Sequence, residues 1–345
     1  MPLPRRITDI QPPVIPILGD WIRSNPGTIS LGQGIVSYGP PPDVAAALQT
    51  FGGSVADHRY GPVEGQPDLL AILQDKLTRE NGIHLDRRRV VVTAGGNMAF
   101  LNAVLAITDP GDEVILPVPF YFNHEMALTM IGCRAVPVRT DANYQLALDA
   151  IGDAITSRTR AIVTVSPNNP TGAVYPEHAL RAVNALCARH GLFHISDEAY
   201  EYFTFGDARH CSPASAAGSR AHTIALFSLS KAYGFASWRV GYMVVPEELF
   251  DSVNKVQDTN LICPPLVCQA GAAAALRVGR AYCVPKVADL DVVRSEVHAT
   301  LAGLGDLVEA PPTDGAFYVL LRVNTTLDAF TLTRRLIEIG RASCR

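Results

Sequence analysis

Short apolar runs alternate with stretches of helical spacing through most of the chain. From about residue 44, the runs are rich in valine, isoleucine and leucine and end at polar residues. Apolar strands that alternate with helices are typical of a mainly parallel sheet covered by helices on both faces. We therefore predict an α/β fold with a mainly parallel seven-stranded sheet, whose strands are residues 89–93, 113–118, 134–138, 160–165, 192–196, 222–228 and 240–245.

The stretches between these runs predict the helices and the domain organisation. Helices are expected over residues 97–107, 124–131, 146–155 and 177–190, with Gly82 and Gly191 as C-caps. Residues 1–43 are expected to form an N-terminal arm and part of a small domain, and residues 44–280 a large domain. A long helix over 284–304, with Val287, Leu290, Val293 and Val297 at helical spacing, and a strand over 316–323 predict part of a smaller α+β domain in residues 281–345.

Composition narrows the class of protein. Hydrophobic residues make up 48% and charged residues 18% of the 345, which is typical of a globular protein. A formal charge of −4 argues against a nucleic-acid or acidic-membrane binder, and no run approaches the roughly 18 apolar residues that span a bilayer. Seven scattered cysteines without a Cys-x-x-Cys pair indicate neither a metal site nor a disulfide framework, so we expect a cytoplasmic protein.

The candidate chemistry lies where the predicted strands end, which is where open α/β sheets bind ligands. Ser228, Ser230 and Lys231 follow the strand 222–228, and Arg239 comes eight residues later. A desolvated lysine is suited to a Schiff base, and two hydroxyls with a nearby arginine can hold a phosphate. An ordinary surface loop is the alternative interpretation of this motif.

Three further motifs occupy equivalent positions. Asn169 lies in Ser-Pro-Asn-Asn-Pro-Thr-Gly after the strand 160–165, and Asp197 and Tyr200 lie in Ser-Asp-Glu-Ala-Tyr after 192–196. Gly96 and Asn97 begin a helix after 89–93, where free amides can hold an anion. Taken singly, the first motif can be a turn and Asp197 a helix cap. The glycines fit neither a dinucleotide-binding fingerprint nor a Walker A loop.

In this order and spacing, the motifs resemble those of the class I/II aminotransferases, over about residues 31–318. These are pyridoxal-phosphate enzymes of fold type I. The resemblance implies that Lys231 forms the Schiff base and acts as general acid and base, and that Asp197 faces the pyridine nitrogen. It also implies that Asn169 and Tyr200 bind the phenolic oxygen of the cofactor, pyridoxal 5′-phosphate.

The resemblance assigns several further roles. The phosphate is expected to contact Gly96, Asn97, Ser228, Ser230 and Arg239, and Tyr121 to stack on the cofactor ring, where aspartate aminotransferases usually have Trp. Gly34, together with Asn169, is expected to line the substrate pocket, and His124 to support Asp197 from behind. Tyr60, in Arg59-Tyr60-Gly61, is expected to reach the phosphate of a neighbouring subunit, which implies a homodimer with shared active sites.

The implied activity is transfer of an amino group from an L-amino acid to a 2-oxo acid in two half-reactions, with ping-pong kinetics. Other pyridoxal-phosphate reactions on the same fold, such as β-elimination, ring-forming lyase chemistry or oxidation, use the same cofactor motifs and stay open. A non-catalytic, aminotransferase-like regulatory domain is a more remote alternative, because no basic N-terminal module is seen.

The C-terminal sequence departs from the family pattern. The match fades after residues 333–337, and no arginine is found at the family position that binds the substrate carboxylate; Arg322, Arg334 and Arg335 do not match it. Residues 338–345 correspond to a translated sequencing adapter, so we expect a truncated chain with an artefactual tail and an incomplete small domain. A natural short C-terminus is the alternative.

Overall fold

The centre of the molecule is a seven-stranded sheet. The structure, a computed structural model, describes residues 3–12, 14–32, 34–340 and 342–343. Strand order is β2-β8-β7-β6-β5-β3-β4; β8 runs antiparallel to both neighbours, and all other pairs are parallel. The predicted strands are confirmed to within one residue at each end, as β2 (Arg88–Thr93), β3 (Glu113–Val118), β4 (Arg134–Arg139), β5 (Thr159–Val165), β6 (Phe193–Asp197), β7 (Thr223–Ser228) and β8 (Gly241–Pro246).

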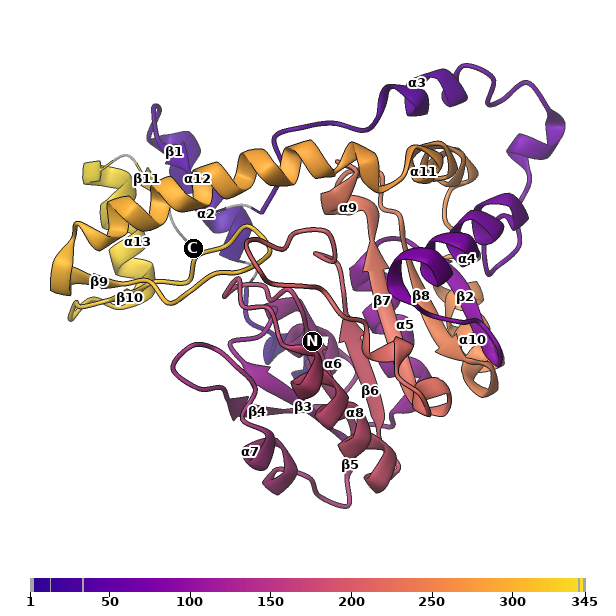
Figure 1. The fold of residues 1–345 in the computed structure, drawn as a ribbon, viewed down its shortest axis with the longest axis horizontal. Coiled ribbons are helices and arrows are strands. Elements are labelled where there is room, and N and C mark those ends of the chain that lie inside the picture. The colour runs from indigo at the N-terminus through magenta and orange to yellow at the C-terminus, as the bar shows by residue number, and fades with distance from the viewer. Residues whose placement is uncertain (1–2, 13, 33, 341, 344–345) are drawn as a thin grey trace.

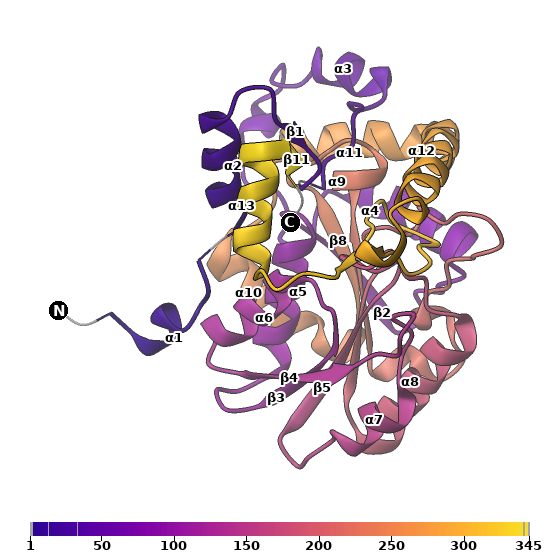
Figure 2. The same cartoon turned by 90° about the vertical axis from the view of Figure 1, so that its left-hand side faces the viewer.

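Helices cover both faces of this sheet, because its strands are apolar on both sides (Figure 2). Neighbouring residues of a strand face opposite layers: Val91 packs in one cluster, and Val90 and Val92 in the other. The first face is covered by α5 (Gly96–Ile107), α6 (Phe122–Met130) and α10 (Phe250–Asn260). The second face is covered by α4 (Pro67–Asn81), α7 (Leu148–Asp153), α8 (Glu177–His190) and α11 (Leu266–Val278).

Segments from the N-terminal and C-terminal parts of the chain lie side by side next to the sheet (Figure 1). The helix α12 (Val284–Ala302) leads away from α11 to the antiparallel pair β9 (Val308–Glu309) and β10 (Arg322–Val323). The helix α13 (Ala329–Gly340) then packs on α2 (Val14–Ser24), where the Trp21 and Phe330 rings meet edge to face at 5.9 Å. β1 (Ile29–Ser30) pairs with β11 (Ala342–Ser343). We therefore propose that described parts of residues 1–43 and 281–345 form the smaller domain, and residues 44–280 the larger.

The predicted strand over residues 316–323 is wrong except for its last two residues, which form β10. The backbone N–H of Gly315 donates to the carbonyl of Gly172 (2.8 Å), and that of Ala316 to the carbonyl of Phe203 (2.9 Å). Ala316 also has a φ of +55°, outside the strand region. Because this segment bonds to loops of the large domain, it has no partner strand along most of its length.

The predicted helices are found close to their predicted positions, but the predicted apolar face of one of them is less buried than expected. Gly82 and Gly191 are confirmed as left-handed C-caps of α4 and α8. Of the predicted apolar face of α12, Val293 and Val297 are 52% and 38% exposed, because the neighbouring C-terminal segment covers only part of this helix. The remaining helices are short: α1 (Arg5–Thr8), α3 (Pro42–Leu48) and α9 (Leu229–Ala232). No described helix is both long and apolar enough to cross a membrane.

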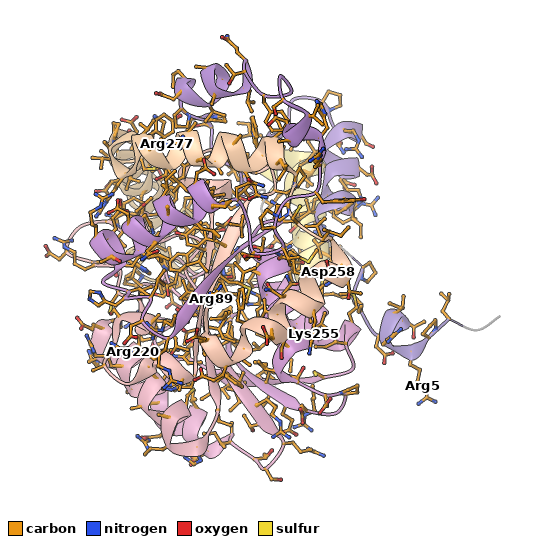
Figure 3. The ribbon with its side chains drawn as sticks, turned by 90° about the vertical axis from the view of Figure 1, so that its right-hand side faces the viewer. Arg5, Arg89, Arg220, Lys255, Asp258 and Arg277 are labelled. Atoms are coloured by element: carbon orange, nitrogen blue, oxygen red, sulfur yellow. The ribbon has the colours of Figure 1, made fainter. Side chains whose placement is uncertain are left out.

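The face formed by α4, α10 and α11 carries mixed charge, and α1 projects as an arm at the side of this view (Figure 3). Arg277 lies 3.4 Å from Asp68 of α4, and the Arg89 guanidinium lies 4.0 Å from the centre of the Phe250 ring. Exposed ion pairs of this kind stabilise a fold by no more than about 1 kcal/mol. We therefore expect buried polar groups to contribute more to the stability of the fold than these exposed ones.

A buried polar network lies at the amino-terminal edge of the sheet, around His194 at the start of β6. The side-chain N–H₂ of Asn184 donates to His194 Nδ1 (3.1 Å) and to the hydroxyl of Thr223 (2.7 Å). His194 Nε2 therefore carries the proton and donates it to Thr164 (2.9 Å). His194 is fully buried, and burial, aided by His222, lowers the pKa of its imidazole from 6.5 to about 3.

This depressed pKa predicts acid sensitivity. Above pH 6.5, His194 is neutral in both states, and its contribution to stability is fully present. Between pH 6.5 and 3 only the unfolded chain binds the proton. As the pH falls through this range, this one group therefore lowers the free energy of unfolding by about 1.4 kcal/mol per pH unit. Urea unfolding across this range should show a shallower pH slope for His194→Gln than for the native chain. The exposed His190→Gln variant should keep the native slope; equal slopes in all three proteins would contradict the prediction.

Candidate active site

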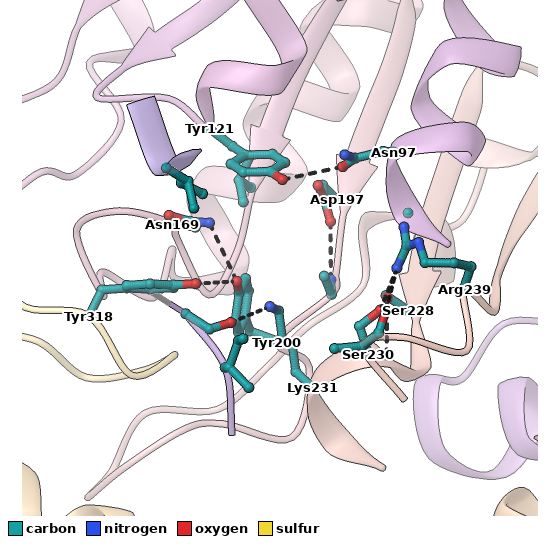
Figure 4. Close-up of a pocket in the computed structure, with 17 residues that line it drawn as sticks. Asn97, Tyr121, Asn169, Asp197, Tyr200, Ser228, Ser230, Lys231, Arg239 and Tyr318 are labelled. Atoms are coloured by element: carbon teal, nitrogen blue, oxygen red, sulfur yellow. Dashed lines mark hydrogen bonds between the residues drawn. The ribbon is translucent and has the colours of Figure 1, made fainter. Parts of the chain in front are cut away.

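The polar motifs at the strand ends meet in one cavity. Its volume is about 290 Å³, and it opens at the edge of the sheet where β2, β5, β6 and β7 end (Figure 4). Because β8 is antiparallel, its first residues, preceded by Arg239, reach the same edge. The described lining includes Gly34, Gly96, Asn97, Tyr121, Asn169, Asp197, Tyr200, Ser228, Ser230, Lys231 and Arg239, all of them predicted site residues.

One end of the cavity is built to hold an anion. Helix α5 begins there at Gly96, so its first backbone N–H groups have no carbonyl partner within the helix. Arg239 Nη1 lies 3.3 Å from the Ser230 hydroxyl. The Ser228 hydroxyl oxygen caps α9 by accepting from the backbone N–H of Ser230 (3.2 Å), which leaves its proton free to donate to a ligand. A cation, helix amides and two hydroxyls are the groups that bind phosphate.

Two glycines make this arrangement possible. A Cβ on Gly95 would lie 2.3 Å from Arg239 Nη2, and Gly95 has a φ of +81°. A Cβ on Gly241 would lie 2.7 Å from the carbonyl oxygen of Phe227 and 2.8 Å from the carbonyl carbon of Gly95. Arg239 itself has a φ of +52°, a strained conformation for a residue with a side chain. The backbone is thus fitted closely around the guanidinium.

Asp197 provides the carboxylate of the site. It is 8% exposed, and its Oδ2 lies 3.1 Å from His124 Nε2, while Oδ1 accepts from the backbone N–H of Ala199 (3.1 Å). His124 is 2% exposed and stacks on Phe100 with the ring centres 4.0 Å apart. The structure therefore places His124 behind Asp197, at the position expected for a supporting residue. These contacts hold the carboxylate in one orientation toward the cavity.

Lys231 and two phenols lie toward the other end. Lys231 Nζ donates to the carbonyl of Gly34 at 2.5 Å. Asn169 Nδ2 donates to the Tyr200 hydroxyl (3.4 Å), which lies 2.7 Å from the hydroxyl of Tyr318. Figure 4 shows Tyr318 on the opposite side of the view from Arg239 and the two serines, with the Lys231 amine and Tyr200 between them. The amine is therefore separated from the Arg239 guanidinium within one cavity.

Tyr121 presents an aromatic ring to the cavity between these ends (Figure 4). Its hydroxyl donates to Asn97 Oδ1 (3.3 Å) and accepts from Asn123 Nδ2 (2.7 Å). These bonds link the ring to the first turns of α5 and α6. A tryptophan at this position could not make the same pair of bonds, because its indole nitrogen only donates.

Of the predicted site residues, His124 and Tyr60 do not line the cavity, and one polar lining residue, Tyr318, was not predicted. Tyr60 is 82% exposed and does not line the cavity of its own chain. Tyr318 was missed because the pattern around it predicted only a strand; its polar hydroxyl within an apolar run was the available signal. A Cβ on Gly34 would lie 2.0 Å from this hydroxyl, so the glycine is required there.

No arginine at a position to bind the substrate carboxylate was identified in the sequence, and the described part of the chain adds none to the cavity. Among its described lining residues, the only arginine is Arg239, at the anion-binding end. Arg322 instead pairs with Glu309 (2.6 Å), and Arg334 with Glu338 (2.8 Å).

The donor set of the cavity fits pyridoxal phosphate. Its cationic end suits the phosphate, the Asp197 carboxylate suits a protonated pyridine nitrogen, and Asn169 with Tyr200 suits a phenolate oxygen. The Lys231 amine can bind an aldehyde, and Tyr121 offers a flat face to an aromatic ring.

Comparisons with known proteins agree with this geometry. Residues 26–339 match the family model for aminotransferase class I and II. The aspartate/prephenate aminotransferase of Thermus thermophilus is 33% identical over 288 residues, 82% of this chain and 74% of that protein. A probable aspartate/prephenate aminotransferase of Aquifex aeolicus is 37% identical over 222 residues, 64% of this chain and 56% of that protein. The structure of Thermus thermophilus aspartate aminotransferase with maleate superposes with a TM-score of 0.91 at 29% identity, covering 99% of this chain and 91% of that one.

These matches confirm the predicted family, the fold and the cofactor that the family uses. With the fold, the strand-end motifs and the matches in agreement, the chain belongs to the class I and II aminotransferases, the pyridoxal-phosphate-dependent enzymes that transfer amino groups.

Proposed function

We propose that this cavity is the active site, in which Lys231 binds the cofactor covalently and moves the proton during amino transfer from an L-amino acid to a 2-oxo acid. One observation carries the proposal: the Lys231 amine, the Asp197 carboxylate and the Arg239 guanidinium line the same cavity. These are the three charged groups needed at the aldehyde, the ring nitrogen and the phosphate of the cofactor.

The anion-binding end positions the cofactor. Arg239, the α5 amides at Gly96 and Asn97, and the hydroxyls of Ser228 and Ser230 hold the phosphate. Because Arg239 is already bonded to Ser230 and to the Ala236 carbonyl (3.0 Å), little side-chain freedom is lost when the phosphate binds. This end therefore acts as an anchor.

Pyridoxal phosphate, when bound, supplies an aldehyde that condenses with amines and a ring that withdraws electrons from the substrate Cα. Asp197 would keep a proton on the ring nitrogen through a charge-assisted hydrogen bond, and His124 holds Asp197 in place. Asn169 and Tyr200 bind the phenolic oxygen, and Tyr121 covers one face of the ring.

Lys231 has two tasks in sequence. Its amine would hold the cofactor through the aldehyde carbon until a substrate amine takes its place. The freed Nζ would then take the proton from the substrate Cα as a general base and deliver it to the former aldehyde carbon of the cofactor as a general acid. Its bond to the Gly34 carbonyl keeps Nζ at the substrate side of the cavity. Two such half-reactions, one with the amino acid and one with the 2-oxo acid, give the ping-pong order.

We also propose a homodimer with shared sites and a cytoplasmic location. The 82% exposure of Tyr60, outside its own cavity, supports a role in the phosphate site of a second subunit. The described cysteines, residues 133, 187, 211, 263, 268 and 283, are all free, which supports a reducing compartment.

Lys231→Ala tests the central assignment. The native protein with added pyridoxal phosphate should show a visible absorption band from the covalent bond to Lys231, and the variant should lose it. Lys255→Ala, which removes an exposed lysine of α10, is the control and should keep the band. A band of equal height in Lys231→Ala would show that another amine binds the cofactor.

Arg239→Gln tests the anchor. Loss of a charged hydrogen-bond donor should weaken binding of pyridoxal phosphate by about 10- to 100-fold, since such bonds contribute roughly 1.5–3 kcal/mol. Binding of pyridoxal, which lacks the phosphate, should change little, because Arg239 then has no anion to contact. Fluorescence titration with both compounds measures the difference, and the exposed Arg277→Gln is the control. Equal losses for the two compounds would place the phosphate elsewhere.

Subunit mixing tests the shared site. Lys231→Ala and Tyr60→Ala homodimers should each be weak, whereas a mixed dimer has one complete site: Lys231 from one subunit and Tyr60 from the other. Co-refolding the two variants should therefore restore up to about half of the native activity per dimer. No recovery from mixed dimers, shown to form by affinity tags, would argue that Tyr60 acts only within its own chain.

A further inference from the structure

Tyr318 is bonded to the group that binds the phenolic oxygen, although no motif pointed to it. Its hydroxyl lies 2.7 Å from the hydroxyl of Tyr200, whose oxygen also accepts from Asn169 Nδ2 at 3.4 Å. An amide N–H₂ group can only donate, so one lone pair of the Tyr200 oxygen is already used. The direction of the bond between the two phenols then decides where the Tyr200 proton points.

The two possible directions have different consequences for the cavity. If Tyr200 donated to Tyr318, the Tyr200 proton would point away from a ligand beside Asn169. If Tyr318 donates, the Tyr200 oxygen accepts two hydrogen bonds, and its own proton remains to be donated into the cavity. A hydroxyl that accepts hydrogen bonds also becomes a stronger donor. Only the second direction lets Asn169 and Tyr200 both donate to one anionic oxygen.

We propose that Tyr318 is a positioning residue that donates its hydroxyl proton to Tyr200 and thereby directs the Tyr200 proton to the phenolic oxygen of the cofactor. The inference rests on the proposed function and adds to it a residue from the C-terminal part of the chain. Tyr200 is 4% exposed, and burial is the main cause that raises the pKa of its hydroxyl well above 10. Tyr200 therefore keeps the proton that it is required to donate.

The position of the Tyr318 hydroxyl is set by both ends of the chain. The segment that carries it is bonded to the large domain through Gly315, which donates to the carbonyl of Gly172 (2.8 Å). Its hydroxyl is packed so closely on Gly34 that a Cβ there would lie 2.0 Å away. Gly34 in turn accepts from Lys231 Nζ, so one short segment contacts both the positioning phenol and the catalytic amine.

The test is the pH midpoint at which the absorption band of the bound cofactor changes. Donation from Tyr200 stabilises the anionic phenolic oxygen, so weaker donation should raise this midpoint. Tyr318→Phe removes one hydroxyl and keeps the ring, and it should raise the midpoint by about 0.5 to 1 pH unit, the worth of one hydrogen bond. In a Tyr200→Phe background, the same substitution should cause no further shift, because Tyr318 acts only through Tyr200.

Controls separate this inference from the proposed function and from a structural effect. Tyr282→Phe removes a phenol that bonds the Gly39 carbonyl outside the cavity lining, and it should leave the midpoint unchanged. Gly34→Ala displaces the Tyr318 hydroxyl without removing it and should raise the midpoint as Tyr318→Phe does. It provides the test if Tyr318→Phe folds poorly. A band with an unshifted midpoint in both variants, or an equal Tyr318→Phe shift with and without the Tyr200 hydroxyl, would overturn the inference. If native protein with added pyridoxal phosphate showed no band, the assignment of Lys231 as the lysine that binds the cofactor would be wrong instead.

Discussion

The alignment of strand ends in the central sheet is the constraint on which the rest of the site depends. Val165 at the end of β5 lies opposite Asp197 of β6, and Asp197 lies opposite Leu226 of β7, so the loops that follow begin at nearly the same level. Gly241, the first residue of the antiparallel strand β8, lies opposite both Thr93 and Ser228. One register thus brings the amide, carboxylate, amine and guanidinium groups of four loops to one cavity.

Buried polar groups have different roles at the two edges of this sheet. At the amino-terminal edge, Glu113 is 1% exposed and accepts from Thr156 (2.6 Å) and Arg158 (2.7 Å), and His194 is bonded at both ring nitrogens. These groups satisfy each other. At the carboxyl-terminal edge, Arg239 and Tyr200 line a cavity, where they are held by neighbours yet can still bond to a ligand. Polar burial stabilises the fold at one edge and provides binding chemistry at the other.

Residues from the N-terminal and C-terminal parts of the chain contact the site residues that follow the strands of the sheet. Gly34 accepts from Lys231, the Tyr38 hydroxyl donates to the Lys231 carbonyl (3.1 Å), and Tyr318 meets Tyr200. These contacts join residues roughly 120 to 200 positions apart in the chain, so they form only when the segments around Gly34 and Tyr318 have packed on the large domain. The site therefore depends on folding of both parts, although most of its charged groups belong to the large domain.

Local sequence patterns are enough to predict the sheet, its covering helices and most of the cavity lining. Apolar runs bounded by polar turns predicted every strand of the main sheet, and the strand-end motifs predicted Lys231, Asp197, Asn169 and Arg239 at one edge. Both signals are local, because burial on two faces requires continuous apolar runs and parallel strands end together. Only the tertiary structure decided that residues 316–321 form no strand and that Tyr318 lies against Tyr200. An apolar run shows that a segment is buried, but its partner, whether a strand, a helix or a loop from the other domain, is set by long-range packing.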